Sequence, residues 1–84
     1  MTITFHRRAF EEYQSWATED PKAFSKINGF IKEISRTPFA GTGSPEPLKH
    51  ELAGCWSRRI TQKHRLVYQV TGETIIIVSC KFHY

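Results

Sequence analysis

Residues 65–84, RLVYQVTGETIIIVSCKFHY, contain two apolar runs separated by a short polar turn. Runs of β-branched and aromatic residues on either side of a glycine-containing turn of this length are typical of a β-hairpin. The stretch therefore predicts antiparallel strands at Arg65–Val70 and Thr74–Phe82. We expect this hairpin to form the centre of the fold.

Two shorter strands are predicted before the hairpin. Cys55–Ile60 leads into it through the turn TQKH, and Leu48–Leu52 ends at the turn glycine Gly54. Residues 37–47, TPFAGTGSPEP, contain three prolines and two glycines, so we predict a loop with stiffened corners.

A strand and two helices are predicted at the start of the chain. Residues 2–6 alternate in polarity, and apolar residues of 8–18 recur at helical spacing. A second helix begins at Pro21, with Asp20 as its N-cap, and should end before Pro38. The pattern indicates an α+β fold with both helices packed on one face of a mainly antiparallel sheet.

Alternation along the strands predicts which side chains share a face of the sheet. The side facing the helices should carry the apolar residues Trp56, Ile60, Leu66, Tyr68, Val70, Ile76, Val78, Cys80 and Phe82. Ile75, Ile77 and Ser79 should face the other way. We expect that face to gather Arg59, Arg65, Lys81 and His83 into a cationic concavity, with Phe82 in the core holding the end of the last strand.

Length and composition predict one small domain that spans residues 1–84. A domain of this size is only marginally stable alone, so a partner or self-association would help it. No apolar segment follows the basic residues at the start, and the run Ile75–Val78 is too short to cross a bilayer. The isolated Cys55 and Cys80 favour a reduced, cytoplasmic setting.

The positive charge is confined to the second half of the chain. Residues 1–48 are neutral, whereas residues 49–84 carry six lysines and arginines against two glutamates, which accounts for the net charge of +4. A polarised basic half is typical of proteins that bind a polyanion such as nucleic acid. A solvated basic surface explains the same charge equally well.

The sequence lacks the common phosphate-binding, dinucleotide-binding and zinc-protease motifs, and it has no spacing typical of metal ligands. We therefore expect no metal and no cofactor. Cleavage of RNA without a metal needs a base for the ribose 2′-OH, cations for the phosphate and an acid for the leaving oxygen. His83 titrates near neutrality, Arg65 offers a fork of donors, and Glu46 is held between two prolines.

Plainer explanations exist for each of these groups. A loop glutamate is usually solvated, an arginine at the start of a strand usually makes a weak surface ion pair, and a terminal histidine usually frays. Arg59, Lys49 and Lys81 would support the anion on the same face. From the residues alone, nucleic-acid binding is better supported than catalysis.

The motifs PEPLKH, WSRRI and HRLVY, together with the terminal KFHY, resemble the YoeB/Txe group of toxins in the RelE/ParE superfamily, over essentially the whole chain. The resemblance implies a microbial-ribonuclease-like fold and a type II toxin that cleaves mRNA in the A site of the 70S ribosome by 2′-OH attack, without a metal. It also implies a homodimer and an antitoxin of the YefM type.

The same resemblance implies a role for each matching residue. Glu46 looks like the general base, Arg65 the phosphate stabiliser and His83 the general acid, while Lys49, Arg59 and Tyr84 look like substrate-positioning groups. Two alternatives stay open: a gyrase-poisoning toxin on the same fold, and a non-catalytic module that binds RNA or the ribosome. The gyrase poisons lack this set of residues, which argues against the first.

Overall fold

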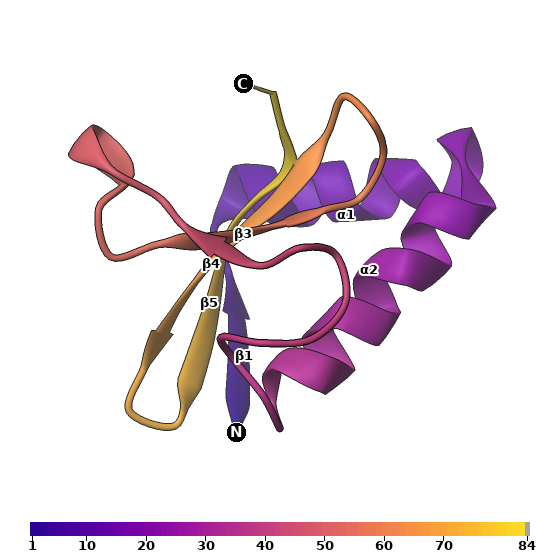
Figure 1. Cartoon of the computed structure of the whole chain (residues 1–84). Helices are drawn as coiled ribbons and strands as arrows, with labels where there is room; N and C mark the ends of the chain where they lie inside the picture. Colours follow the sequence, from indigo (N-terminus) through magenta and orange to yellow (C-terminus); the bar gives the residue numbers. More distant parts are fainter. Residues whose placement is uncertain (84) are drawn as a thin grey trace.

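The computed structural model of the chain describes residues 1–83, and its elements follow one another as expected for an α+β domain (Figure 1). They are β1 (Thr2–Phe5), α1 (Arg7–Glu19), α2 (Pro21–Ile34), β2 (Glu46–Pro47), the short 3₁₀ helix η1 (His50–Leu52), β3 (Trp56–Arg59), β4 (Arg65–Thr71) and β5 (Thr74–Phe82). Among residues 1–83, no helix is long and apolar enough to cross a membrane.

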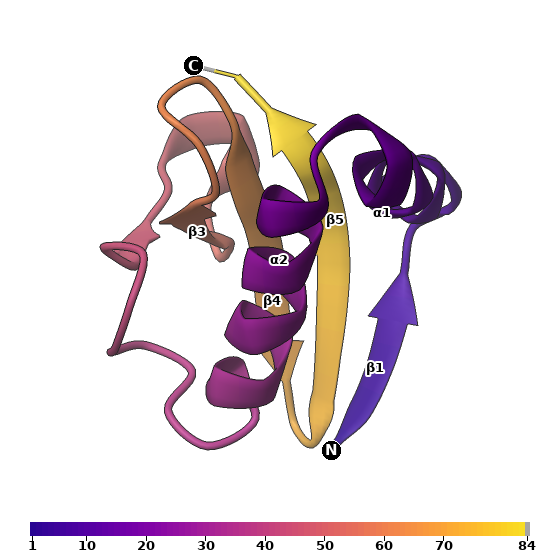
Figure 2. The ribbon, with the colours of Figure 1, turned by 90° about the vertical axis from the view of Figure 1, so that its right-hand side faces the viewer.

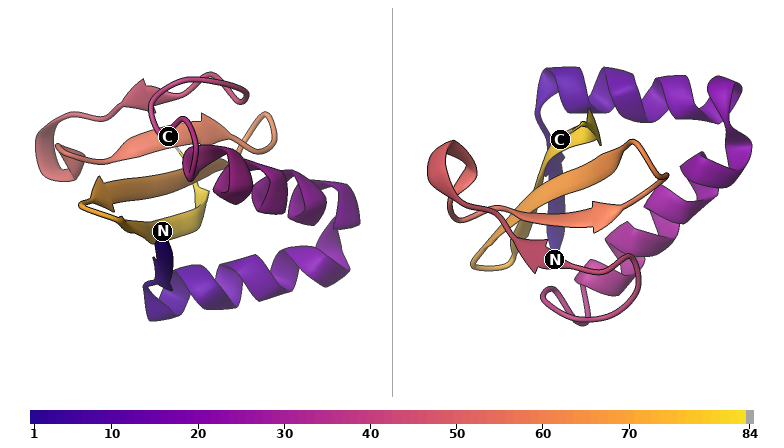
Figure 3. Two further views of the ribbon diagram at one scale, coloured as in Figure 1. Left: turned by 90° about the horizontal axis from the view of Figure 1, so that it is seen from below. Right: turned by 45° about the horizontal axis from the view of Figure 1, so that its top comes forward.

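The strands described form one mixed sheet in the order β1-β5-β4-β3-β2. β1 runs parallel to β5, and the other neighbours are antiparallel. Figure 2 shows α2 in front of β4 and β5, with α1 beside the far end of β5. Figure 3 shows the helices diverging from their junction to cover one side of the sheet. This arrangement confirms the predicted fold class.

The core lies between the helices and the sheet. From the helices it takes Ala9, Trp16, Ala23, Ile27, Phe30, Ile31 and Ile34, and from the strands and the turn after β3 it takes Ile60, Leu66, Tyr68, Ile75, Ile77 and Cys80. The junction of the helices is as predicted, because the Asp20 side chain accepts a hydrogen bond from the Ala23 N–H at 3.2 Å and Pro21 opens α2.

The predicted alternation of buried and exposed side chains along β5 is wrong for residues 75–78 and for Phe82. Ile75 and Ile77 are fully buried in the core, whereas Ile76 and Val78 are half-buried and lie outside it. Only the expectation for Cys80, which is also fully buried, holds.

Two register breaks explain the difference. Tyr68 pairs with Ile77 and Val67 with Ser79, so one residue of β5 is extra at this point. Arg65 then pairs with Phe82, which inserts a second extra residue. Each bulge reverses the alternation. Phe82 is therefore on the face of Arg65, not in the core.

The predicted strand Leu48–Leu52 is also wrong. The strand is displaced to Glu46–Pro47, and the chain then turns into η1. His50 has a φ of 58°, a left-handed conformation that ends an extended segment. The Leu48 N–H closes the loop by donating to the Cys55 carbonyl at 2.9 Å.

Candidate active site

The face of the sheet opposite the helices, called the open face below, carries the charged side chains of Glu46, Arg59 and Arg65 from three neighbouring strands. Arg59 pairs with Arg65 across β3 and β4, and Arg65 pairs with Phe82 of β5. Glu46 of β2 pairs with Ser57. Residues paired in this way present their side chains on the same face. The sheet therefore places Glu46, Arg59 and Arg65 together, as predicted.

An ion pair between Glu46 and Arg65 is the centre of this face. The Arg65 Nη1 atom donates to Glu46 Oε1 at 3.3 Å. The arginine side chain is 15% exposed and the carboxylate side chain is 51% exposed. Ser57, the residue of β3 that pairs with Glu46, has a small side chain that is fully buried. The pair is open to solvent on the side of the carboxylate.

The buried Ser57 hydroxyl finds no hydrogen-bond partner within the part of the chain that the structure describes. Buried polar groups nearly always make a hydrogen bond, so the Ser57 hydroxyl is an exception on the open face.

A shallow depression of about 360 Å³ adjoins the ion pair. Its lining residues are Glu46, Pro47, Leu48, Lys49, His50, Leu52 and Phe82. Lys49 is exposed and brings a further cation to the depression, as predicted. The Phe82 ring, which sequence reasoning assigned to the core, lines it instead. The depression thus combines apolar side chains with a carboxylate and a lysine.

His83 follows directly after Phe82, the residue that pairs with Arg65. The imidazole is exposed, and its ring centroid lies 6.3 Å from that of His64. The His64 ring in turn meets Trp16 edge-on at 5.3 Å. His83 also lines a depression with Arg8, Glu12 and Lys81, so its contacts lie on the α1 side of the end of β5. The expectation that His83 shares the face of Arg59 and Arg65 is therefore not confirmed. Tyr84, the other terminal residue of interest, lies outside the described residues.

Lys81 does not join this group, and the expectation that it shares a face with Arg59 and Arg65 is wrong. Its ammonium pairs with Glu19 at the end of α1 and lies 4.9 Å from the centre of the Trp16 ring. The hydrogen bond from Lys81 lowers the pKa of Glu19. The second bulge of β5 is the reason, because it turns Lys81 toward α1.

Arg58 supports the site from the other side of the sheet. Its guanidinium is fully buried. The Nε atom donates to the Tyr68 hydroxyl, and the other nitrogens donate to the Glu33 carboxylate and to the carbonyls of Thr37, Ala40 and Thr42. These contacts fix the loop that leads to Glu46. Sequence reasoning missed this role, although β3 alternation already places Arg58 with Trp56 and Ile60.

The loop before Glu46 is held at a second point. The Arg59 N–H donates to the Gly43 carbonyl at 2.7 Å, and a Cβ at Gly43 would lie 2.6 Å from the Phe30 ring. The φ of 81° at Gly43 also favours glycine. Glu46 thus follows a loop that is packed on the core, which gives its carboxylate a defined position.

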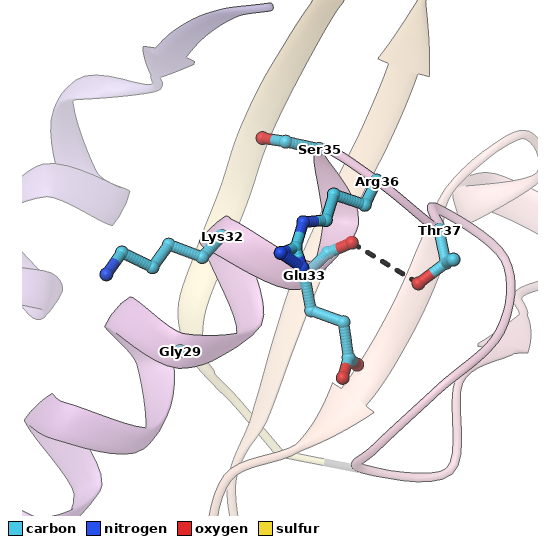
Figure 4. A pocket seen from close by; sticks show the side chains of 6 residues that line it. All are labelled: Gly29, Lys32, Glu33, Ser35, Arg36 and Thr37. Carbon is cyan, nitrogen blue, oxygen red and sulfur yellow. Dashed lines mark hydrogen bonds between the residues drawn. The ribbon is translucent and has the colours of Figure 1, made fainter.

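A larger depression, of about 740 Å³, lies at the end of α2 (Figure 4). It is lined by Gly29, Lys32, Glu33, Ser35, Arg36 and Thr37. Its acid is already engaged, because Glu33 accepts hydrogen bonds from Thr42 and Arg58. Figure 4 shows Lys32 and Glu33 pointing in different directions. Size alone therefore does not make this hollow the site.

Metal and thiol chemistry find little support in the side chains. Within residues 1–83, no three His, Cys, Asp or Glu side chains group in a way that could hold a metal ion. Burial raises the pKa of Cys80 to about 12 and also raises the pKa of Cys55. Both thiols are thereby kept protonated at neutral pH, which is unsuitable for a nucleophile.

Comparison with known proteins identifies close relatives over the full length. Residues 5–84 match the model of a family described as YoeB-like toxin of bacterial type II toxin-antitoxin system. The chain is 48% identical over 84 residues to Toxin YoeB of Escherichia coli K12, covering 100% of both chains.

Solved structures show the same similarity to YoeB toxins. A YoeB/ParE toxin from Agrobacterium tumefaciens superimposes with a TM-score of 0.95 at 44% identity, covering 100% of both chains. The YoeB dimer from Staphylococcus aureus gives 0.93 at 47% identity, and the YoeB-YefM complex from the same organism gives 0.91 at 46%; each covers 100% of this chain and 98% of that one.

Proposed function

Because this chain belongs to the family of YoeB-like toxins of bacterial type II toxin–antitoxin systems, we propose that it is an endoribonuclease that cleaves mRNA in the ribosomal A site and so inhibits translation. The observation that carries the proposal is the Glu46–Arg65 pair on the open face of the sheet. The pair supplies a base and a cation next to a shallow groove for phosphodiester cleavage by the ribose 2′-OH, and His83, directly after the groove residue Phe82, is proposed as the acid.

The proposed reaction uses groups of the chain alone. Glu46 takes the proton of the 2′-OH, whose oxygen attacks the adjacent phosphorus and forms a cyclic phosphate. The bond from phosphorus to the 5′-oxygen breaks, and His83 gives that oxygen a proton. Arg65 donates hydrogen bonds to the phosphate oxygens as negative charge develops on them.

Further cations would hold the message. Arg59 pairs with Arg65 in register, and Lys49 lines the same depression as Glu46, so both can reach neighbouring phosphates. Tyr84, directly after the proposed acid, would lie alongside the substrate. The proposal omits Lys81, which is engaged with Glu19.

The proposed partners follow from the same relatives. The Staphylococcus aureus protein is known as a dimer and in complex with YefM. We extend both to this chain: a homodimer, and an antitoxin of the YefM type that covers the open face until the toxin is released. Because the proposed substrate is ribosome-bound message, the proposed location is the cytoplasm.

The decisive experiment compares ribosome-bound and free message. A translation reaction with a defined mRNA is incubated with the purified toxin, and primer extension maps new 5′ ends within codons. We expect cleavage that is much faster on the ribosome, because the ribosome holds the message in the geometry for attack. Binding without new ends would indicate a non-catalytic module, and equal rates on free RNA would contradict ribosome dependence.

His83→Ala tests the proposed acid. We expect cleavage to fall by about 10²–10⁴-fold, the usual contribution of a general acid or base. Thermal stability should change little, because the imidazole is exposed. Arg36→Ala, which removes an exposed charge near the end of α2, is the matched control. A loss of activity no larger than in the control would refute the assignment.

A further inference from the structure

The end of β5 is held by side chains of α1 as well as by the sheet. At the second bulge, the Cys80 N–H donates to Glu12 Oε1 at 2.8 Å. The Cys80 carbonyl accepts from the Trp16 indole N–H, also at 2.8 Å. A bulge disturbs the regular ladder and leaves backbone groups that need other partners. Both main-chain groups of Cys80 find those partners on α1.

Side chains on one face of α1 bind three successive residues at the end of β5. Glu12, Trp16 and Glu19 are four and three residues apart, the spacing of side chains on one helix face. Glu12 also accepts from the Ser79 hydroxyl at 3.3 Å, and Glu19 pairs with Lys81. The face thus binds Ser79, Cys80 and Lys81 in order, up to the residue before Phe82.

We propose that Glu12 is a positioning residue, which fixes the second bulge of β5 and thereby the place of Phe82 and His83 relative to Arg65. The proposal rests on the proposed function only where it assigns His83 a role in cleavage. Glu12 itself acts through the backbone of Cys80, on the side of the sheet that carries α1. Without the bulge, simple alternation would turn Phe82 away from the face of Arg65.

A surface role for Glu12 accounts for much less. Its ion pair with Arg8 spans 3.8 Å, and the Arg8 side chain is 88% exposed, so the pair adds little. The Glu12 side chain is only 18% exposed and makes two hydrogen bonds across 67 and 68 residues of sequence. The carboxylate is therefore directed at the strand, with the ion pair as a secondary contact.

Four variants of the full chain separate the two roles. Glu12→Ala removes the acceptor, and Glu12→Asp keeps the charge but shortens the side chain by one methylene. Glu12→Gln keeps an oxygen at the same distance. Arg8→Ala removes only the ion pair. The readouts are hydrogen exchange of the Cys80 amide, the NMR positions of the His83 ring protons, and kcat and KM for cleavage on programmed ribosomes.

Glu12→Ala and Glu12→Asp should lose protection of the Cys80 amide and shift the His83 ring signals. Their kcat should fall by about 10- to 100-fold with little change in KM, because misplacing a catalytic group by about an ångström costs this much. Glu12→Gln and Arg8→Ala should match the wild type in all readouts.

Unchanged His83 signals in both Glu12→Ala and Glu12→Asp would overturn the proposal, as would a Glu12→Gln protein that is as impaired as Glu12→Ala. If the wild type itself cleaves no message, the proposed function fails, but the exchange and ring signals still decide whether Glu12 positions His83. If Glu12→Ala does not fold, Glu12→Asp provides the same comparison.

Discussion

The two faces of the sheet each carry an arginine–glutamate pair, and the pairs differ in their surroundings. On the helix side, the Arg58 side chain is fully buried and its guanidinium binds Glu33, the Tyr68 hydroxyl and three loop carbonyls. On the open side, Arg65 meets Glu46, whose side chain is 51% exposed. The same two residue types form one pair whose arginine is fully buried and one whose carboxylate is open to solvent.

The surroundings of each pair decide what it can do. A buried guanidinium is tolerated only when its donors are satisfied, so Arg58 is committed to holding the loop before Glu46. A pair that faces water can exchange one partner for a phosphate at little cost in desolvation. We infer that Arg58 stabilises the fold and that Arg65 serves the ligand.

Arg58→Ala should show the largest effect on stability. Breaking a buried pair leaves Glu33 and the loop carbonyls without their donor, and such losses typically cost about 3–5 kcal/mol in the free energy of unfolding. Arg59→Ala, at the next position but on the open face, should stay within about 0.5 kcal/mol of the wild type. Urea denaturation of both proteins checks this. Equal losses of stability in Arg58→Ala and Arg59→Ala would contradict the inferred difference between the two faces.

The decrease in the free energy of unfolding at acid pH should depend on the Arg58–Glu33 pair on the helix side. Hydrogen bonds, chiefly from the Thr42 N–H, lower the pKa of Glu33 below its model-compound value of 4.5. A carboxyl whose pKa is lowered by folding stabilises the protein above its unfolded pKa, and this contribution is lost as the pH falls through the folded pKa. The free energy of unfolding should therefore decrease below about pH 4.5.

Glu33→Gln should reduce that decrease when urea denaturation is repeated between pH 7 and pH 3. Glu19→Gln is the comparison, because the Lys81 hydrogen bond also lowers the pKa of Glu19. An acid dependence that Glu33→Gln leaves unaltered would show that the helix-side pair does not contribute to it.

Ser57→Ala should have the smallest effect. The Ser57 hydroxyl is buried on the open face without a partner among residues 1–83. Removing an unsatisfied buried hydroxyl is neutral or stabilises the fold by up to about 1 kcal/mol. A clear loss of stability in thermal denaturation would mean that the hydroxyl is paired after all, and that the two faces are equally satisfied.

Local patterns predicted much of this molecule. The junction at Asp20 and Pro21 depends on neighbouring residues only, and the phase of β3 and β4 follows from simple alternation. The faces of Arg59 and Arg65 were therefore predictable. Reasoning from the residues already grouped Glu46 with Arg65, family resemblance added their individual roles, and the structure brings the two within 3.3 Å.

The end of β5 could not be predicted in this way. Its bulges have no glycine to mark them, and the partners that satisfy Cys80 are Glu12 and Trp16, more than sixty residues earlier in the chain. Alternation therefore misplaced Phe82 and Lys81. The early end of the strand before η1 likewise depends on the left-handed backbone of His50, which is uncommon for any residue other than glycine.

In the proposed mechanism, the open face is the reaction site and the helix face supports it. Arg65→Ala tests this most directly, with cleavage of a ribosome-bound message and urea denaturation measured on the same protein. We predict a loss of about 10²–10³-fold in cleavage rate, the usual cost of removing one donor to a developing anion, with a smaller loss in the free energy of unfolding than Arg58→Ala shows. Cleavage at the wild-type rate, or a loss only in proportion to unfolded protein, would contradict the claim.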